Sequence, residues 1–140
     1  MVKQNQWRIF QSGIIIGIVL LVLNSVESWL ASGLYAASDP ALWQTMSGNW
    51  WLQMLVYSLV VGLVFALVYG VLHQGIPGQG LAKGVQYGFW VWLVGSVPGL
   101  LMTLMTMAVP AELVVLWLVS NLINLLVVGL ILGAWAKFKE

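Results

Sequence analysis

The sequence has no cysteine and very little charge. The missing cysteine excludes disulfides, thiolate metal sites, iron–sulfur clusters and cysteine nucleophiles together. Only 6% of the 140 residues are charged, whereas soluble domains carry about 25%. The net charge of +1 leaves no basic patch that could neutralise several phosphates, so we expect no nucleic-acid partner. With 61% hydrophobic residues, the chain could not hide its apolar surface in water. We therefore expect lipid as its solvent and membrane lipids as its partners.

Four apolar segments are each long enough to cross a bilayer, which takes about 20 residues. They cover about 9–31, 50–73, 84–108 and 111–136. The sequence therefore predicts an all-α fold, a four-helix transmembrane bundle that forms a single integral membrane domain over 1–140. We expect this multi-pass protein in the cell membrane of a bacterium or archaeon.

The basic residues indicate how the bundle is oriented. They precede the first span, separate the second from the third, and follow the fourth: Lys3, Arg8, Lys83, Lys137 and Lys139. If both termini are cytoplasmic, all of them lie on one side of the membrane. The opposite side receives Asp39 and Glu112, so the positive-inside rule predicts an N-in/C-in topology.

The first outer loop, Ser32–Asn49, contains a helix-start signal. Asp39 before Pro40 resembles an N-cap followed by a first-turn proline, which predicts a short helix over Ala41–Met46. Because Trp43 lies in this segment and tryptophans flank the loop, we expect the short helix to lie in the outer membrane interface.

Small residues recur four positions apart in every span. Residues of this size let helix backbones approach closely where lipid supplies no hydrophobic drive between helices. We expect all of these residues to mediate helix packing in the cytoplasmic half of the bundle. They are Gly13 and Gly17; Gly62, Ala66 and Gly70; Gly84 and Gly88; Gly129 and Gly133.

The outer half of the spans is bulkier and carries polar residues at overlapping depths. Helices that are tight at one end and bulky at the other should splay. We therefore predict an outward-opening crevice with a polar floor and a wall of Tyr57, Trp117 and methionines. Its ligand-binding residues are Asn24, Glu27, Ser28, Ser58, Thr103, Asn121 and Asn124, and the methionines are Met102, Met105 and Met107.

Two further features concern the last two spans. On the fourth span, Asn121 and Asn124 point about 80° and about 140° away from Gly129, which gives this helix two faces that avoid lipid. The second face needs another helix or another chain, so we expect a homodimer or a larger membrane complex as an alternative to a monomer. In the third span, Gly95 to Gly99 surround Pro98 and predict a kink or a short break.

Two ionisable residues are candidates for chemistry. Glu27 is an acidic residue within a span, which suggests a proton carrier or a cation anchor, although a side chain near a helix end also reaches headgroup water. His73 could bind a cofactor as an axial ligand to haem or a chlorin, although a lone histidine is more often a satisfied polar group. Serine nucleophiles lack a partnering histidine, and metal-ligand clusters are absent, so we expect no enzyme, no metal and no required cofactor.

The run from Pro77 to Trp92 reads P-G-x-G-x-x-K-G-x-x-Y-G-x-x-x-W. This pattern resembles one found in uncharacterised four-span prokaryotic membrane proteins. The resemblance implies the four-span fold and implies no activity.

The leading interpretation is a small membrane protein without catalytic activity. It would bind a lipid or another hydrophobic ligand in the crevice, or serve as an accessory subunit of a membrane complex. The first alternative is a small transporter or channel that uses the polar layer around Glu27. The second alternative is a pigment- or haem-binding subunit that uses His73.

Overall fold

The structure is a computed structural model that describes residues 2–43 and 48–135. This part of the chain is almost entirely helical and contains no strand. The elements are α1 (Val2–Leu30), α2 (Ser32–Ala37), the 3₁₀ turn η1 (Pro40–Leu42), α3 (Trp50–Leu72), the 3₁₀ turn η2 (His73–Gly75), α4 (Gly80–Val91), the π-helical segment η3 (Trp92–Ser96), α5 (Val97–Thr106) and α6 (Ala111–Trp135).

Four helices of the described part are long and apolar enough to cross a membrane, as predicted. They cover Gln6–Leu30, Trp50–Gly75, Gly80–Thr106 and Ala111–Trp135. Large apolar side chains remain exposed on them, including Met105 at 82%, Val94 at 73% and Val71 at 72%. An apolar surface of this extent suits lipid better than water.

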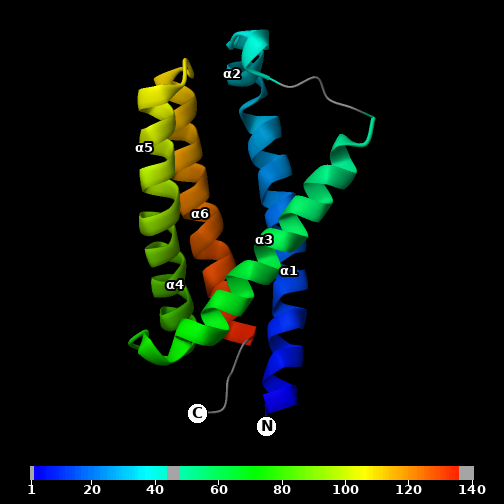
Figure 1. Cartoon of the computed structure of the whole chain (residues 1–140), viewed down its shortest axis with the longest axis vertical. Coiled ribbons are helices and arrows are strands. Elements are labelled where there is room, and N and C mark those ends of the chain that lie inside the picture. The colour runs from blue at the N-terminus through cyan, green and yellow to red at the C-terminus, as the bar shows by residue number, and fades with distance from the viewer. Residues whose placement is uncertain (1, 44–47, 136–140) are drawn as a thin grey trace.

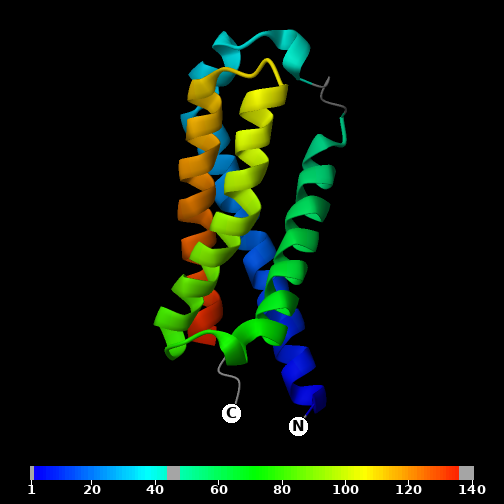
Figure 2. The ribbon, with the colours of Figure 1, turned by 60° about the vertical axis from the view of Figure 1, so that its left-hand side comes forward.

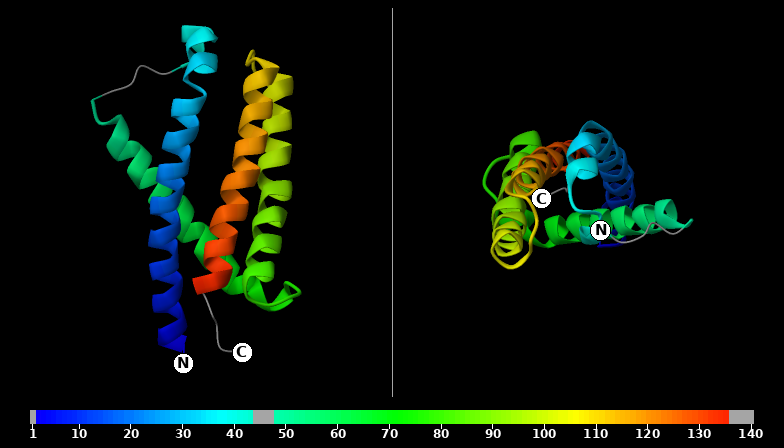
Figure 3. Two further views of the ribbon diagram at one scale, coloured as in Figure 1. Left: turned by 180° about the vertical axis from the view of Figure 1, so that it is seen from behind. Right: turned by 90° about the horizontal axis from the view of Figure 1, so that it is seen from above.

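The helices form two pairs, α1 with α3 and α4 with α6. The first residues of α1 and the end of α6 lie at one end of the bundle, here called the base, and α2 lies at the other end, the top (Figure 1). From their crossing, α3 diverges from α1 toward the top, whereas α5 and α6 run side by side (Figures 1 and 2). Seen from above, α3 extends away from the remaining helices (Figure 3).

Glycines bring the backbones of α1 and α3 into direct contact at the crossing. A Cβ atom built on Gly62 would overlap the carbonyl oxygen of Gly13 and the backbone nitrogen of Gly17. A Cβ atom on Gly17 would come within 2.9 Å of the Ser58 carbonyl oxygen. A larger residue at these positions would have to move backbone atoms, which are less able to adapt than side chains.

The second pair, α4 with α6, also meets over a row of small residues. A Cβ atom on Gly84 would overlap the Gly129 carbonyl oxygen, and one on Gly88 would overlap the carbonyl oxygen of Leu125. Gly133 meets the Gly80 carbonyl oxygen in the same way, a contact that the sequence did not predict.

Two members of the predicted packing set behave differently. Ala66 is fully buried in the core, whereas Gly70 faces the side chain of Ile9 and no backbone.

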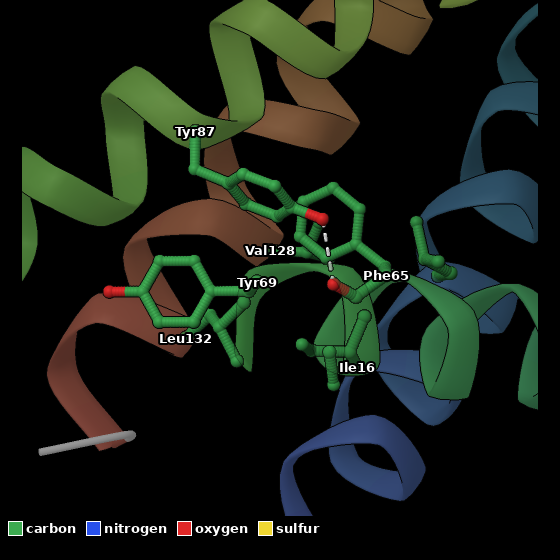
Figure 4. Close-up of a cluster of buried hydrophobic side chains, with 8 residues drawn as sticks. Ile16, Phe65, Tyr69, Tyr87, Val128 and Leu132 are labelled. Atoms are coloured by element: carbon green, nitrogen blue, oxygen red, sulfur yellow. Dashed lines mark hydrogen bonds between the residues drawn. The ribbon is translucent and has the colours of Figure 1, made fainter. Parts of the chain in front are cut away.

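An aromatic core near the base joins the two pairs. Tyr87 of α4 inserts between Phe65 and Tyr69 of α3, with ring centroids 4.6 Å and 5.1 Å away (Figure 4). The Tyr87 hydroxyl donates a hydrogen bond of 2.8 Å to the Phe65 carbonyl oxygen. Ile16 from α1 and Val128 from α6, both fully buried, complete this contact. The pairs are therefore packed together at the base, where Tyr87 is 2% exposed.

The structure changes two predictions about local elements and adds one element. The irregularity predicted from Gly95 to Gly99 is a π-helical segment, and the helix continues through it into α5 without a break. The loop between the first two spans contains the unpredicted helix α2, and the short helix expected over Ala41–Met46 is a 3₁₀ turn, although Gln44–Met46 lie outside the described residues. Asp39 does cap that turn, since its carboxylate accepts a hydrogen bond of 2.9 Å from the Ala41 N–H.

The turn before α4 explains why the third span begins earlier than predicted. Gly78 and Gly80 have positive φ angles of 91° and 53°, which other residues rarely adopt. These two glycines turn the chain sharply, so that the helix starts at Gly80 and not near Gly84. The span ends at Thr106, before the predicted 108, because Met107 is extended.

We predict that Gly84→Ala will destabilise the protein by about 2 kcal/mol or more, because the new methyl group overlaps the backbone of α6. Gly99→Ala is the matched control, since a Cβ atom there meets nothing within 4 Å. This control should be neutral or stabilise the helix by up to about 1 kcal/mol. Denaturant unfolding in detergent, followed by tryptophan fluorescence, measures both. Equal losses in the two variants would show that the close contact of α4 and α6 is not required.

Candidate functional site

A cavity of about 270 Å³ lies above the crossing of α1 and α3, and we call it the polar cavity. Its polar lining residues come from four elements and are Asn24, Ser58, Ser96, Asn121 and Asn124. Its apolar wall is formed by Leu20, Val61, Val91 and Leu125, with Tyr57 and Gly95. Four of the seven residues predicted to bind a ligand therefore line one cavity.

The divergence of α3 creates this space. Ser58 lies one helical turn above Gly62, where α3 begins to leave α1, and α3 makes only sparse backbone contacts with α5 and α6. Tyr57 and Gly95 line the cavity and are themselves exposed. The mouth therefore lies between α3 and the third span and faces sideways, toward the position that lipid would occupy.

Two asparagines fix the position of α1 against α6 inside the cavity. The Asn124 Nδ2 atom donates a hydrogen bond of 3.2 Å to the Oδ1 atom of Asn24, and Asn124 is 6% exposed. The second lipid-avoiding face of α6 is thus covered by α1 of the same chain. Asn124 supplies no argument for a partner chain, and the homodimer or larger complex stays a prediction.

The Ser58 hydroxyl is the exceptional polar group of the described residues. It is 1% exposed and has no hydrogen-bond partner. Serines inside helices commonly donate to the carbonyl oxygen four residues earlier. Ser12 and Ser25 do so, each at 2.7 Å. A buried hydroxyl without a partner costs about 1–3 kcal/mol. The Ser58 oxygen is closed off in this conformation, so a ligand in the cavity would bond it only after the serine side chain turns toward the cavity.

Three predicted ligand-binding residues do not line the polar cavity. Glu27 lies higher, within reach of the Ser120 hydroxyl. Ser28 is exposed, and the Thr103 hydroxyl donates to the Gly99 carbonyl oxygen at 3.0 Å. The predicted methionine wall is also wrong. The three methionines in and after α5 do not line the polar cavity, and all three are exposed: Met102, Met105 and Met107.

Trp117, predicted as a crevice wall, instead belongs to an aromatic cap at the top of the bundle. Its Nε1 atom donates a hydrogen bond of 2.7 Å to the Tyr35 hydroxyl oxygen. Trp43 packs edge-on against both rings and donates to the Ser38 hydroxyl at 2.7 Å. Burial raises the pKa of the Tyr35 phenol, the Glu27 charge adds to this, and the Trp117 hydrogen bond opposes it. The cap ties α2 and η1 to α6.

His73 lies away from the polar cavity, at the end of α3. Its Nδ1 atom is 2.8 Å from the Gly70 carbonyl oxygen. Because a carbonyl only accepts, Nδ1 carries a proton in this arrangement. This contact is the satisfied polar role that is common for a lone histidine, and cofactor binding by His73 stays a prediction.

Ser96 is the polar lining residue that the sequence did not assign to the site. It lies in η3, next to Gly95. The run from Gly95 to Gly99 does indicate an irregular helix here. Helical periodicity does not show which residues of an irregular segment face the bundle. The Trp92 Nε1 atom donates to the Leu118 carbonyl oxygen at 2.9 Å and holds η3 against α6.

The polar cavity can form hydrogen bonds but offers no obvious covalent or acid–base chemistry. Its polar groups are amides and hydroxyls, and no charged side chain lines it. Over residues 2–43 and 48–135, no group of three or more His, Cys, Asp or Glu could hold a metal ion.

We predict an energetic coupling of about 0.6–1.7 kcal/mol between Asn24 and Asn124, the range typical of hydrogen bonds between membrane helices. A double-mutant cycle with Asn24→Leu and Asn124→Leu, read by unfolding in detergent, measures it. The control cycle pairs Asn24→Leu with Asn121→Leu, because Asn121 lines the same cavity without bonding Asn24. A coupling near zero in both cycles would contradict the inter-helix bond.

The geometry described above is the available guide to function. No family model matches the chain, and no curated protein and no solved structure is significantly similar to it.

Proposed function

We propose that this chain is a small polytopic membrane protein without catalytic activity that binds a lipid or another hydrophobic molecule. The observation that carries the proposal is a laterally open, polar-lined cavity that contains a buried hydroxyl without a partner. The same site is compatible with a role for this protein as an accessory subunit of a larger complex.

An apolar groove lies next to the polar cavity, toward the base. This groove has a volume of about 550 Å³ and is lined by Leu72, Ile76, Tyr87, Trp90 and Val94. Val91 and Gly95 line both spaces, so the two are neighbours. A polar cavity beside an apolar groove matches a molecule with a polar head and an apolar tail.

The sizes of the two spaces support this division. The polar cavity equals the liquid volume of roughly nine water molecules, at about 30 Å³ each, which suits a head group and not a whole lipid. The groove is larger and is walled mainly by apolar side chains, which suits a tail. A tail leaving the groove would still contact apolar side chains such as Val94, because this residue is 73% exposed.

We further propose that the base faces the cytoplasm of a bacterial or archaeal cell. Arg8 and Lys83 lie near the base, whereas Asp39 lies at the top. The positive-inside rule favours this orientation. α2 and η1 would then lie in the outer interface, where Trp29 and Trp43 are suited to the headgroup level.

Gly95→Leu should abolish ligand binding. Gly95 lines both spaces, and a Cβ atom there meets nothing within 4 Å, so the backbone has room for a side chain and a leucine should narrow the site. Gly99→Leu is the control, since it adds the same side chain to an equally open position outside both spaces. Native mass spectrometry of protein purified in mild detergent should show a co-purified ligand in the wild type and in Gly99→Leu, and about tenfold less in Gly95→Leu. Equal retention in both variants would place the ligand elsewhere and contradict the proposed site.

Orientation can be measured with single cysteines, because the chain has none of its own. Gly75→Cys at the base and Gly48→Cys at the top are suitable, since a Cβ atom at either position meets nothing within 4 Å. A membrane-impermeant maleimide added to intact cells should label Gly48→Cys and should label Gly75→Cys only after permeabilisation. The opposite pattern would reverse the proposed topology.

Transport is the second candidate function. It is favoured by the π-helical η3, because π-helical turns often occur at functional sites and this one lines the polar cavity. Flux of a solute into proteoliposomes that Gly95→Leu abolishes and Gly99→Leu preserves would favour transport over simple binding.

A further inference from the structure

We infer that the head group bound in the polar cavity is uncharged and carries a hydroxyl, so that the ligand is a lipid alcohol with a long apolar tail. This inference rests on the proposed function and names the ligand class of the same site. Diacylglycerols and isoprenoid alcohols are two sources of this chemistry.

The lining of the cavity excludes a charged head group. The polar groups of its lining residues are the hydroxyls of Tyr57, Ser58 and Ser96 and the amides of Asn24, Asn121 and Asn124. Glu27 lies outside the cavity beside Ser120, and Arg8 and Lys83 belong to the base. A phosphate or an ammonium group would therefore lose its water without gaining an opposite charge, which is far costlier than burying an uncharged group.

The depth of the cavity strengthens this argument. Ser58 and Asn121 lie about 12 Å and about 15 Å along their helices from the top ends of their spans, at 1.5 Å per residue. The hydrocarbon layer is about 30 Å thick in total, so these groups lie inside it, below the headgroup level. An uncharged alcohol can enter this depth much more easily than a phospholipid head.

The hydrogen-bonding groups favour a hydroxyl over a carbonyl. Ser58 offers a donor and an acceptor, neither of which is used within the described chain. The bond between Asn124 and Asn24 uses one amide N–H and one amide oxygen, which leaves the Asn24 amino group as a donor and the Asn124 oxygen as an acceptor. A hydroxyl satisfies donors and acceptors together, whereas a quinone or ester carbonyl can only accept.

The apolar groove accounts for the tail. It begins at Val91 and Gly95, the two residues that it shares with the polar cavity, and extends to Leu72 and Ile76 near the base. A head in the polar cavity can therefore place its tail in the neighbouring groove. A short alcohol would leave the groove unfilled, so a long tail is part of the ligand class.

Photolabelling in phosphatidylcholine nanodiscs tests the head-group class. The probes are a diacylglycerol and a phosphatidylglycerol that carry the same diazirine acyl chain, and the labelled peptides are identified by mass spectrometry. The diacylglycerol should label the peptides of α3 and α4–η3 at least fivefold more strongly. An excess of an unlabelled long isoprenoid alcohol should compete if the hydroxyl is sufficient, and failure to compete would assign the site to glycerol lipids.

Ser58→Ala provides the residue-level test. Labelling should fall roughly fivefold, the loss expected for one hydrogen bond. Thermal stability of the ligand-free protein should not fall, because the Ser58 hydroxyl bonds nothing in the described chain. Ser25→Ala is the matched control, since Ser25 is exposed and bonds its own helix. A loss of stability in Ser58→Ala with unchanged labelling would overturn the inference, because the hydroxyl would then have only a structural role.

The outcomes separate the inference from the proposed function. Preferential labelling of the same peptides by the phosphatidylglycerol probe, or stronger competition by a quinone than by an alcohol, would overturn the lipid-alcohol inference and leave the binding site standing. Labelling of neither peptide above the level of Gly95→Leu would overturn both.

Discussion

Direct contact between glycine backbones is the constraint on which the rest of this structure depends. Both helix pairs use it. Gly62 meets Gly13 and Gly17, and above this crossing α3 leaves α1 toward the top. Gly84 and Gly88 meet the backbones of Gly129 and Leu125, and α5 and α6 run side by side above them. The divergence of α3 leaves space on its side, which is where the polar cavity lies.

Three further contacts each hold one helix or turn against another. At the base, the Tyr87 hydroxyl bonds the Phe65 backbone and fixes α4 against α3. Near mid-depth, Asn24 and Asn124 fix α1 against α6. At the top, the aromatic cap ties α2 and η1 to α6 through Tyr35 and Trp117. None of these upper contacts includes α3, and the cavity lies beside its upper half.

Features that depend on the properties of a single helix can be predicted from the sequence. Features that depend on how two helices pack against each other cannot. Span number follows from length and apolarity, and the small-residue faces follow from spacing by four. Ser28 and Asn24 fall on the same predicted face of α1, yet Ser28 is exposed because α6 covers only part of that face. The methionines share the depth of the polar residues, which predicts a cavity wall, but α5 leaves their side chains exposed. Ser96 was missed because its orientation depends on the π-helical turn, which no periodicity signals.

That turn explains why Gly88 and Gly95 have different surroundings. In an uninterrupted α-helix, seven residues rotate the chain by about 700°, so Gly95 would face nearly the same direction as Gly88, toward α6. A π-helical turn acts as one inserted residue and rotates the following helix by about 100°. The structure fits this rotation: Gly88 lies against the Leu125 backbone, whereas a Cβ atom on Gly95 meets nothing and Gly95 lines the cavity instead. Pro98, which lacks an N–H group, makes the irregular turn less costly at this point, because one hydrogen bond of a regular helix would be missing there in any case. The π-helical turn thus moves a small residue from the helix contact to the cavity mouth, where it lines both the polar cavity and the apolar groove.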